Sequence, residues 1–576
     1  MTCGILISSP HLQVRRSWEM AGREKEYSDK LRLTERILSN VMIRLRSAIN
    51  PTCSVNKFPP EILTHCFLYL TPYFPFTLGP EEPEHDCIRV AHVCKYWRTV
   101  AFGFSGLWDR IEVTRPEILD MSLKLSGSRP LEVCLKHVGH RFRQTLESRA
   151  CHDVLFDLLV PVGSRIHSLI IHKDLIPPRG RSLFVEGSLP ELETLSITSG
   201  IGWENESDNE PQRRLRALFR GGLPRLRKLF IPEYTPWPHN DFKNLTSLCL
   251  YNQSALEEEL CELLQMLRGS PNLEELYVRQ HESSDWIDDP PLDLGPAFPA
   301  HSLRKLRLHN FSTVATVCIL STMLLQPNGV AVHISDTVMA KDTFGQIFPL
   351  FPRGYTLGNA EKLEVYHVPN ETFGIMFCCT GGSLRIGGCL SWHDGEDRTE
   401  AAVSLFRYIY QECAQTLKEL WIHDFNDEED GYIFDDFTCF NLESLVLVGG
   451  GDVSDCLCAR LDPGNPEIRD LPTPRLQSLT IRRLNEQSQL ERLIGLCEGR
   501  SKTDHPIQEV SVAHEWRDAP EWMTRLCRSS PTPIHIDTRD EWDGQMMELP
   551  TICRDDGPPW WPSWEEVIDF TSQYGS

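Results

Sequence analysis

One stretch of the sequence carries side chains of the kind that bind calcium. The segment from Asn426 to Gly431 (NDEEDG) resembles the beginning of a calcium-binding loop, in which carboxylate and amide oxygens surround the ion. A loop of this type ends with a bidentate glutamate at its twelfth position, and here that position is Phe437. The segment is therefore interpreted as a solvated acidic loop, and no metal site is predicted.

Motifs that would do enzyme chemistry are missing from the sequence. It contains no G-x-x-x-x-G-K-[ST] phosphate-binding loop, no H-E-x-x-H zinc site and no G-x-S-x-G nucleophile turn. Three glycines, Gly449 to Gly451, follow an apolar run, but they are typical of a turn because the rest of a dinucleotide-binding motif is absent. We therefore expect a protein that is not an enzyme, without catalytic residues and without a cofactor.

The 20 cysteines do not indicate a zinc site, because they are scattered and no two stand in a C-x-x-C arrangement. Several of them, such as Cys249, Cys261 and Cys413, lie in apolar runs. Buried thiols that act as small hydrophobic side chains are typical of a reducing compartment. A cytoplasmic or nuclear location is therefore expected.

Charge and length exclude several classes of protein. The chain has 576 residues and a formal net charge of −23. Binding to duplex nucleic acid needs clustered Lys and Arg, so nucleic acid is not an expected partner. No stretch is long and apolar enough for a signal-peptide core or a bilayer span, so no membrane partner is expected either. The length predicts at least two folded units.

The N-terminal part is predicted to contain one long helix. Residues 1–23 are expected to be disordered, and residues 24–50 carry an apolar pattern with alternating spacings of three and four. The residues of this pattern are Leu31, Thr34, Leu38, Val41, Leu45 and Ala48. A single amphipathic helix packing on its own chain is favoured over a dimer zipper, which stays open as the alternative.

Two amphipathic helices with a proline-rich loop between them follow over residues 58–108. The first begins at Phe58-Pro59-Pro60-Glu61, where a proline in the first turn and an acidic residue just inside are typical of a helix start. The second runs from Ile88 to Ala101, and the segment closes with Leu107-Trp108.

The pair of segments FPPEIL…F and VCKYWRTVAF…LW resembles an F-box, in the form common among fungal F-box proteins. The resemblance implies a compact helical domain whose apolar face docks on the Skp-type adaptor of cullin–RING ubiquitin ligases. The insert at residues 71–87 is longer than in a minimal F-box. The adaptor-binding residues that the resemblance implies are Phe58, Pro59, Pro60, Ile62, Leu63, Phe67, Leu70, Val93, Cys94 and Trp97. The alternative is a helical hairpin whose apolar stripes pack on the next domain, because periodicity does not distinguish a core from an interface.

A repeated pattern, L-x-x-L-x-[LIV], begins further along the chain. Its central leucines are spaced irregularly, as in divergent leucine-rich repeats, with helical patterns between them. They are Leu169, Leu195, Leu229, Leu248, Leu276, Leu306, Leu420, Leu445 and Leu479. Degenerate copies in the gap before Leu420 are expected at 330–334, 363–365 and 384–386. Strand, helix and parallel strand in succession predict a solenoid that buries its leucines between neighbouring units.

The expected fold class is α/β: an N-terminal helix and a small all-α F-box, followed by an irregular leucine-rich-repeat-like solenoid with a parallel concave sheet. The F-box is assigned to residues 54–110 and the solenoid to 111–539. Residues 540–576 form a Trp-rich C-terminal segment, which is predicted to cap the last repeat, with a tail that takes part in binding a partner peptide as the alternative.

Alternation along each strand places the residues between the leucines outward, on the concave face. The candidate target-binding residues there are Phe230, Tyr251, Tyr277, Arg279, Arg307, His309, Trp421 and His423. Exposed aromatic and arginine side chains are typical of binding hot spots, and Lys228, Lys305 and Arg307 would suit an acidic or phosphorylated target. The alternative is that loops or the C-terminal segment cover these side chains.

The sequence therefore predicts a substrate-recognition adaptor of an SCF-type cullin–RING ubiquitin ligase. The F-box would bind the Skp-type adaptor, and the repeats would bind a target protein whose identity the sequence does not give. The alternative is a free-standing leucine-rich-repeat scaffold for protein interactions, with no ligase role.

Overall fold

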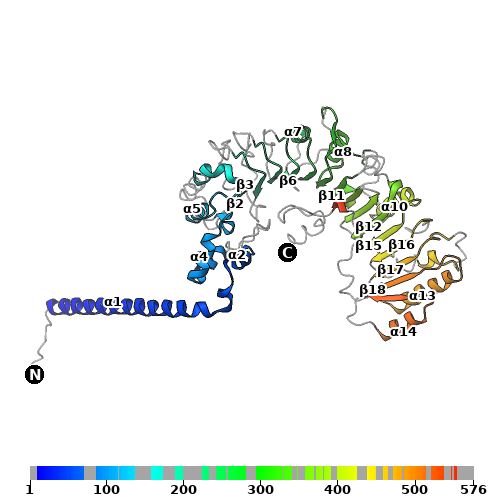
Figure 1. Ribbon diagram of the computed structural model, residues 1–576. Coiled ribbons are helices and arrows are strands. Elements are labelled where there is room, and N and C mark those ends of the chain that lie inside the picture. The colour runs from blue at the N-terminus through cyan, green and yellow to red at the C-terminus, as the bar shows by residue number, and fades with distance from the viewer. Residues whose placement is uncertain are drawn as a thin grey trace, which may run out of the picture. The chain divides into compact units, whose positions relative to one another are not determined.

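Figure 1 shows a computed structural model of the chain. It describes residues 10–69, 86–113, 116–135, 157–172, 189–198, 223–232, 242–253, 257–280, 294–326, 329–339, 347, 350, 357–368, 372–379, 382–390, 398–423, 438–448, 458–464, 471–482, 486–513, 520–537, 547 and 551–553. The acidic loop at 426–437, the glycines 449–451, the insert at 71–85 and the tryptophans after residue 559 lie outside these ranges. None of the described helices is long and apolar enough to cross a bilayer.

The chain divides into two compact units. The first comprises Met1–Tyr73 and Glu81–Cys134, and the second comprises Phe74–Pro80 and Leu135–Ser576. The first unit therefore extends about two dozen residues beyond the boundary expected at residue 110, through β1 (Arg110–Val113), α5 (Pro116–Leu125) and most of β2 (Leu131–Leu135).

The N-terminal helix α1 (Pro10–Ile49) is longer than predicted. The expected disorder of residues 1–23 is wrong from Pro10 onward, since a proline fits the first helical turn and the following residues up to Ile49 include no second proline. The expectation that this helix packs on its own chain is also wrong, because every side chain from Leu31 to Ile49 is exposed.

The folded part of the first unit is built around one small core. Helices α2 (Pro60–Leu68), α3 (Asp86–Val93) and α4 (Lys95–Gly103) bring their apolar residues together with Trp108. The buried members of this core are Leu63, Phe67, Val90, Ala91, Val100, Ala101, Leu107 and Trp108. Strand β1 pairs with β2, and α5 adds Met121 and Leu125 to the same core.

The second unit is organised on one large, mostly parallel sheet. Its strands follow one another in chain order, except for one inserted group in the middle. In the order in which they pair, the strands of this unit are β3 (Ile166–His172), β4 (Thr194–Thr198), β5 (Lys228–Pro232), β6 (Ser247–Gln253), β7 (Glu275–Gln280), β9 (Lys305–His309), β11 (Ala331–Met339), β14 (Gly382–Leu390), β13 (Thr372–Cys379), β12 (Ala360–Val368), β15 (Glu419–His423), β16 (Ser444–Val448), β17 (Ser478–Arg482), β18 (Glu509–Ala513) and β19 (Ile534–Asp537). A separate parallel pair joins β8 (Phe298–Ala300) to β10 (Met323–Leu325).

The inserted group reverses the order of the strands at the middle of the sheet. Strand β11 pairs with β14 rather than with β12, and β12 pairs with β15. Strand β13 lies between β12 and β14 and is antiparallel to both. The three predicted degenerate copies, at 330–334, 363–365 and 384–386, fall on β11, β12 and β14.

The central leucines of the repeated pattern form the interior of the second unit. Leu229, Leu248 and Leu276 are paired in register on β5, β6 and β7, and all three are buried, as predicted. Figure 1 shows the helices between strands gathered on one side of the sheet: α7 (Glu257–Arg268), α8 (Thr313–Thr322), α10 (Arg398–Cys413), α13 (Gln487–Ser501) and α14 (Glu521–Ser529). We call the opposite side the helix-free face, because none of these five helices lies on it.

Helix α13 begins with a capping box. Glu486 is the N-cap and pairs with Gln489, although Ser488 and Glu491 offer a second pair for a capping box. The two sequences have the same spacing, and the upstream choice adds two residues to the helix.

Candidate functional site

The first candidate surface is an apolar stripe on the first unit. Pro59 is the N-cap of α2, and its extended backbone leads Phe58 outward. Phe58, Ile62 and Tyr69 are exposed by 46%, 49% and 81%. Ile62 and Tyr69, seven residues apart, lie on one side of α2 and its C-cap, and Phe58 directly precedes the N-cap. Val93, at the end of α3, is also exposed. Large apolar side chains grouped in this way are typical of a surface that binds a partner.

The predicted adaptor-binding residues divide between this surface and the core. Phe58, Pro59, Pro60, Ile62 and Val93 are exposed. Leu63 and Phe67 belong to the core, Cys94 is buried, and Leu70 lies outside the described residues. Assigning the buried three to a docking face is therefore wrong. Their helical spacing fits the inner stripe of the hairpin as well as it fits an interface.

The Trp97 side chain makes contacts within its own unit. Its indole Nε1 donates a hydrogen bond of 2.6 Å to Oδ1 of Asn56, and its ring lies 5.2 Å from that of Phe67. Cys94 is the N-cap of α4, and its sulfur accepts a bond from the Trp97 backbone N–H. These contacts fasten the chain before α2 to the helical core. The adaptor-binding residues expected from the sequence do not include the exposed Leu68, Tyr69 and Phe102, of which Tyr69 lies seven residues after Ile62.

The second candidate surface is a row across the helix-free face. Register places one residue from each strand side by side, and the members at the centre of the sheet are Phe230, Cys249, Tyr277, Arg307, His333, Arg385, Met376, Glu364, Trp421 and Val446. The candidate target-binding residues Phe230, Tyr277, Arg307 and Trp421 all stand in this row. Tyr251, Arg279, His309 and His423 stand two places further along their strands.

These side chains are not exposed, contrary to the prediction. Phe230, Tyr277, Arg279, Arg307, His309 and Trp421 are buried, and Tyr251 and His423 are partly buried. Strand alternation correctly directs them away from the leucines, but alternation says nothing about what covers the outer face of a sheet. These residues are covered by other parts of the chain, which is the alternative given above.

Arginine side chains lie over aromatic rings on this face. The guanidinium of Arg279 lies 4.9 Å from the centre of the Tyr251 ring and donates a 2.7 Å bond to its hydroxyl. The guanidinium of Arg307 lies 4.8 Å from the centre of the Tyr277 ring. Such stacking fixes the planar cations in place, and planar cations bind carboxylate and phosphate oxygens well.

Three charged or titratable residues of the row were missed. His333, Arg385 and Glu364 are buried at the same register position, on β11, β14 and β12. Oε1 of Glu364 lies 2.7 Å from Nε2 of His423 on the neighbouring strand. All three occupy the middle position of the degenerate repeat copies, so the alternation rule applied to those copies would have found them.

The C-terminal segment accounts for part of the covering. Met547 packs with Met376, Cys378, Trp421 and Val446, on β13, β15 and β16. Cys553, in the short helix η11 (Thr551–Cys553), packs against Ala331, and its sulfur lies 2.9 Å from the hydroxyl of Ser383. Figure 1 shows η11, in red, beside β11.

These contacts differ from the predicted cap over the last repeat. The described residues of the segment lie on the middle strands β11 and β13 to β16, not on β19. The physical reason is that apolar side chains gather there: Met376 on β13, Trp421 on β15 and Val446 on β16 pack in one cluster, with only β12 between β13 and β15.

Burial also sets the charge of His309, on β9. Desolvation first, and then the positive charges of Arg279 and Arg307, lower the pKa of this imidazole from 6.5 to about 2. Its Nδ1 lies 2.8 Å from the hydroxyl of Ser335, on β11. His309 is therefore neutral at physiological pH, so the positive charge of the row comes from arginines.

This pKa predicts an acid sensitivity. The unfolded chain binds a proton at His309 below about pH 6.5, whereas the folded chain does so only near pH 2, so the stabilising contribution of neutral His309 is complete above pH 6.5 and is lost as the pH falls. We expect a His309→Asn variant to lose about 2 kcal/mol less stability than the unmodified protein between pH 7 and pH 5. Urea unfolding at both pH values measures this difference. A substitution of the exposed His505 is the control, and equal losses in all three proteins would refute the assignment.

No protein-family model matches the chain, and no curated protein matches it. Among the residues that the structure describes, no group of three or more His, Cys, Asp and Glu side chains is arranged to hold a metal ion.

Proposed function

We propose that this protein is a substrate-recognition adaptor of an SCF-type cullin–RING ubiquitin ligase, in which the first unit is an F-box that binds a Skp-type adaptor. The observation that carries the proposal is the exposed apolar stripe of Phe58, Ile62 and Tyr69 on a small helical module. The module has a core of its own, which does not use these three residues. An apolar stripe that the fold does not need is available for a partner.

The second unit is proposed to be a leucine-rich-repeat-like solenoid that holds the target protein. Parallel strands in register, buried leucines and intervening helices support this fold. The arginine and aromatic row of the helix-free face is the proposed target site, and it suits an acidic or phosphorylated peptide. Because Met547 and Cys553 lie on the same face, a target that uses the row has to displace the C-terminal segment.

The test of the adaptor site is a binding measurement with a double variant, Ile62→Ala with Val93→Ala. Truncating a buried interface anchor costs over about 1 kcal/mol, so two together are expected to raise the Kd for a purified Skp-type adaptor at least about tenfold. Both side chains are about half exposed or more in the free chain, so the variant is expected to keep its fold. Isothermal titration calorimetry measures the affinity and circular dichroism checks the fold.

The matched control removes exposed apolar side chains from the second unit, at Leu324 and Phe440. It is expected to bind the adaptor as tightly as the unmodified chain. Undiminished binding by the Ile62 and Val93 variant would overturn the adaptor surface. If the unmodified chain itself fails to bind any Skp-type adaptor, the free-standing scaffold is the better assignment.

A further inference from the structure

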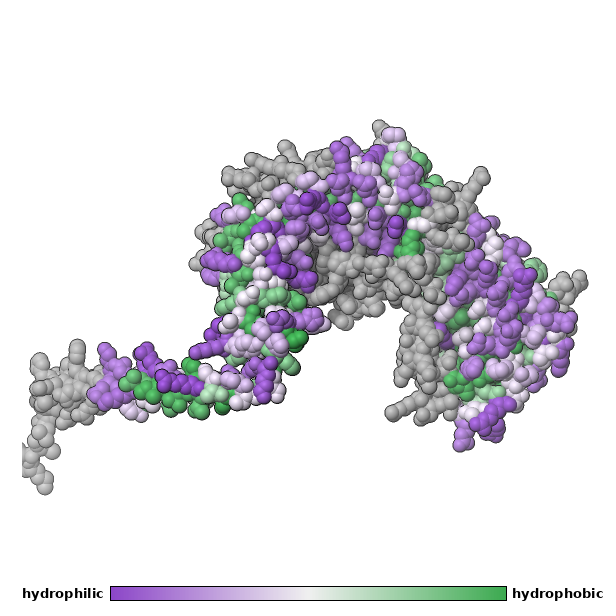
Figure 2. Space-filling view, in the orientation of Figure 1, coloured by the Kyte–Doolittle hydropathy of each residue, from purple (hydrophilic) through white to green (hydrophobic). Residues whose placement is uncertain are grey.

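Helix α1 has a broad apolar stripe that no described residue covers. Eight large side chains form the stripe, each 48–66% exposed: Tyr27, Leu31, Ile37, Leu38, Val41, Met42, Leu45 and Ile49. At 3.6 residues per turn they fall within about 140° of the helix circumference. Figure 2 shows green apolar side chains along one side of α1 with purple polar ones beside them. A single helix of this composition gains little from folding unless its stripe is buried.

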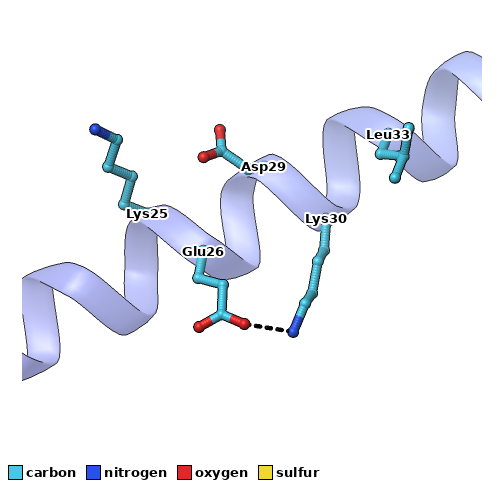
Figure 3. A pocket seen from close by; sticks show the side chains of 5 residues that line it. All are labelled: Lys25, Glu26, Asp29, Lys30 and Leu33. Carbon is cyan, nitrogen blue, oxygen red and sulfur yellow. Dashed lines mark hydrogen bonds and ion pairs between the residues drawn. The ribbon is translucent and has the colours of Figure 1, made fainter.

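Near its start, the helix is polar beside the stripe. Figure 3 shows Lys25, Glu26, Asp29 and Lys30 in succession along the helix and Leu33 at the end of the row, with Nζ of Lys30 2.7 Å from Oε1 of Glu26. All five side chains come from one helix, so the depression that they line is open to solvent rather than enclosed. Lys30 lies at the margin of the stripe.

The stripe has heptad spacing. Leu31, Leu38 and Leu45 occupy the first core position (a) of successive heptads, and Thr34 and Val41 occupy the second (d). Thr34 does not interrupt the stripe, because its hydroxyl donates a 2.8 Å hydrogen bond to the backbone oxygen of Lys30 in its own helix. Its polar atom therefore has a partner, and its methyl group is free to pack.

The charges beside the stripe indicate which partner binds it and whether the two helices run parallel or antiparallel. In this heptad numbering Lys30 stands at position g and Glu35 at position e, on either side of the stripe. In a parallel, in-register assembly, position g of one helix faces position e of the next heptad in its neighbour, so Lys30 of one copy meets Glu35 of another. An antiparallel assembly instead pairs e with e and g with g, which opposes like charges.

We propose that α1 joins copies of this chain in a parallel coiled coil. Leucine at position a, a β-branched residue at d, and apolar Ile37 and Met42 at the flanking g and e positions favour more than two helices, with four as the expected number. The assembly multiplies the target-binding units held together, which raises the avidity for a target with several recognition sites. The inference does not depend on ligase function, because it concerns only α1.

The main experiment measures the molar mass of the full chain by sedimentation equilibrium over a range of concentrations. The unmodified protein is expected to be a multiple of the 66.0 kDa chain, and a variant with Leu38→Glu and Leu45→Glu is expected to be monomeric. Glutamate keeps a good helix propensity, so the variant disrupts the stripe rather than the helix. The matched control places glutamate at Leu33 and Ile43, which are equally exposed but lie on other sides of the helix, and it is expected to stay assembled.

A charge exchange tests the direction. Lys30→Glu alone is expected to weaken assembly by roughly tenfold, and adding Glu35→Lys is expected to restore it. A Thr34→Cys variant is expected to form an additional interchain disulfide on oxidation, since parallel, in-register helices bring the same d positions together. A monomeric unmodified chain, or an assembly that survives the Leu38 and Leu45 changes, overturns the proposal. Failure of the Thr34→Cys cross-link overturns the parallel arrangement.

Discussion

Replacing Trp108 by alanine is expected to remove about 3–5 kcal/mol of stability from the first unit. Trp108 is 1% exposed and lies at the centre of the small core formed by α2, α3 and α4. Its indole Nε1 also donates a 2.8 Å hydrogen bond to the backbone oxygen of Ala101, which the variant leaves without this partner. A loss of this size is comparable to the whole stability of many small domains. Urea unfolding followed by hydrogen exchange in α2 and α4 measures it.

A neighbouring ring provides the matched control. Phe102 lies 5.8 Å from Trp108, between ring centres, but is 42% exposed. Its replacement by alanine is expected to cost much less, because little buried volume is removed. Equal losses for the two variants would show that the core is not where the structure places it. Trp108→Ala is also expected to abolish the proposed adaptor binding through unfolding, whereas the Ile62 and Val93 variant is expected to weaken it in a folded chain.

The repeated leucine pattern was sufficient to place most strands of the second unit. Leucines at the spacing L-x-x-L-x-L are forced inward on a parallel sheet, so Leu229, Leu248 and Leu276 could be assigned to the core. The order of the strands could not be predicted from this pattern. Periodicity is the same for a parallel and an antiparallel strand, so nothing in the pattern of β13 (TFGIMFCC) separates it from its neighbours or reveals the reversal of β12 to β14.

The candidate sites were harder to predict than the fold. In a sequence, an apolar residue that binds a partner has the same pattern as one that another part of the chain covers. On α2, Ile62 is exposed and Leu63 is buried, although both fit the apolar stripe of one amphipathic helix. On β15, alternation correctly turns Trp421 away from the leucine core, yet Trp421 is 8% exposed, because Met547 packs against it from more than a hundred residues away. Contacts at this separation leave no local periodic signal.

Met547 attaches the C-terminal segment to the helix-free face, and the segment is expected to detach when this contact is weakened. Met547 is 1% exposed, and its partners Met376 and Cys378 come from β13 while Trp421 comes from β15. Trp421 is held by further contacts, since Arg482 lies 4.9 Å from its ring centre and its Nε1 donates a 2.8 Å bond to Glu419. The sheet side of the contact is therefore fixed, and the C-terminal segment is the part expected to detach.

Met547→Ala is expected to weaken the attachment of the C-terminal segment by about 2–5 kcal/mol, the usual cost of removing a buried methionine side chain. The thiol of Cys378 reports the detachment, because burial first, and then the nearby Cys553, raise its pKa to about 12 and make it unreactive. Alkylation of Cys378, followed by mass spectrometry, is expected to become at least about 30-fold faster in the variant, since about 2 kcal/mol corresponds to that change in the open population. Cys497, buried in α13, is the internal reference and is expected to keep its rate, as is Cys378 in a Leu324→Ala control.

If the row is the target site, the Met547→Ala variant binds a target peptide more tightly, because the C-terminal segment no longer competes for the face. Unchanged alkylation of Cys378 would instead mean that Met547 does not hold the segment in place.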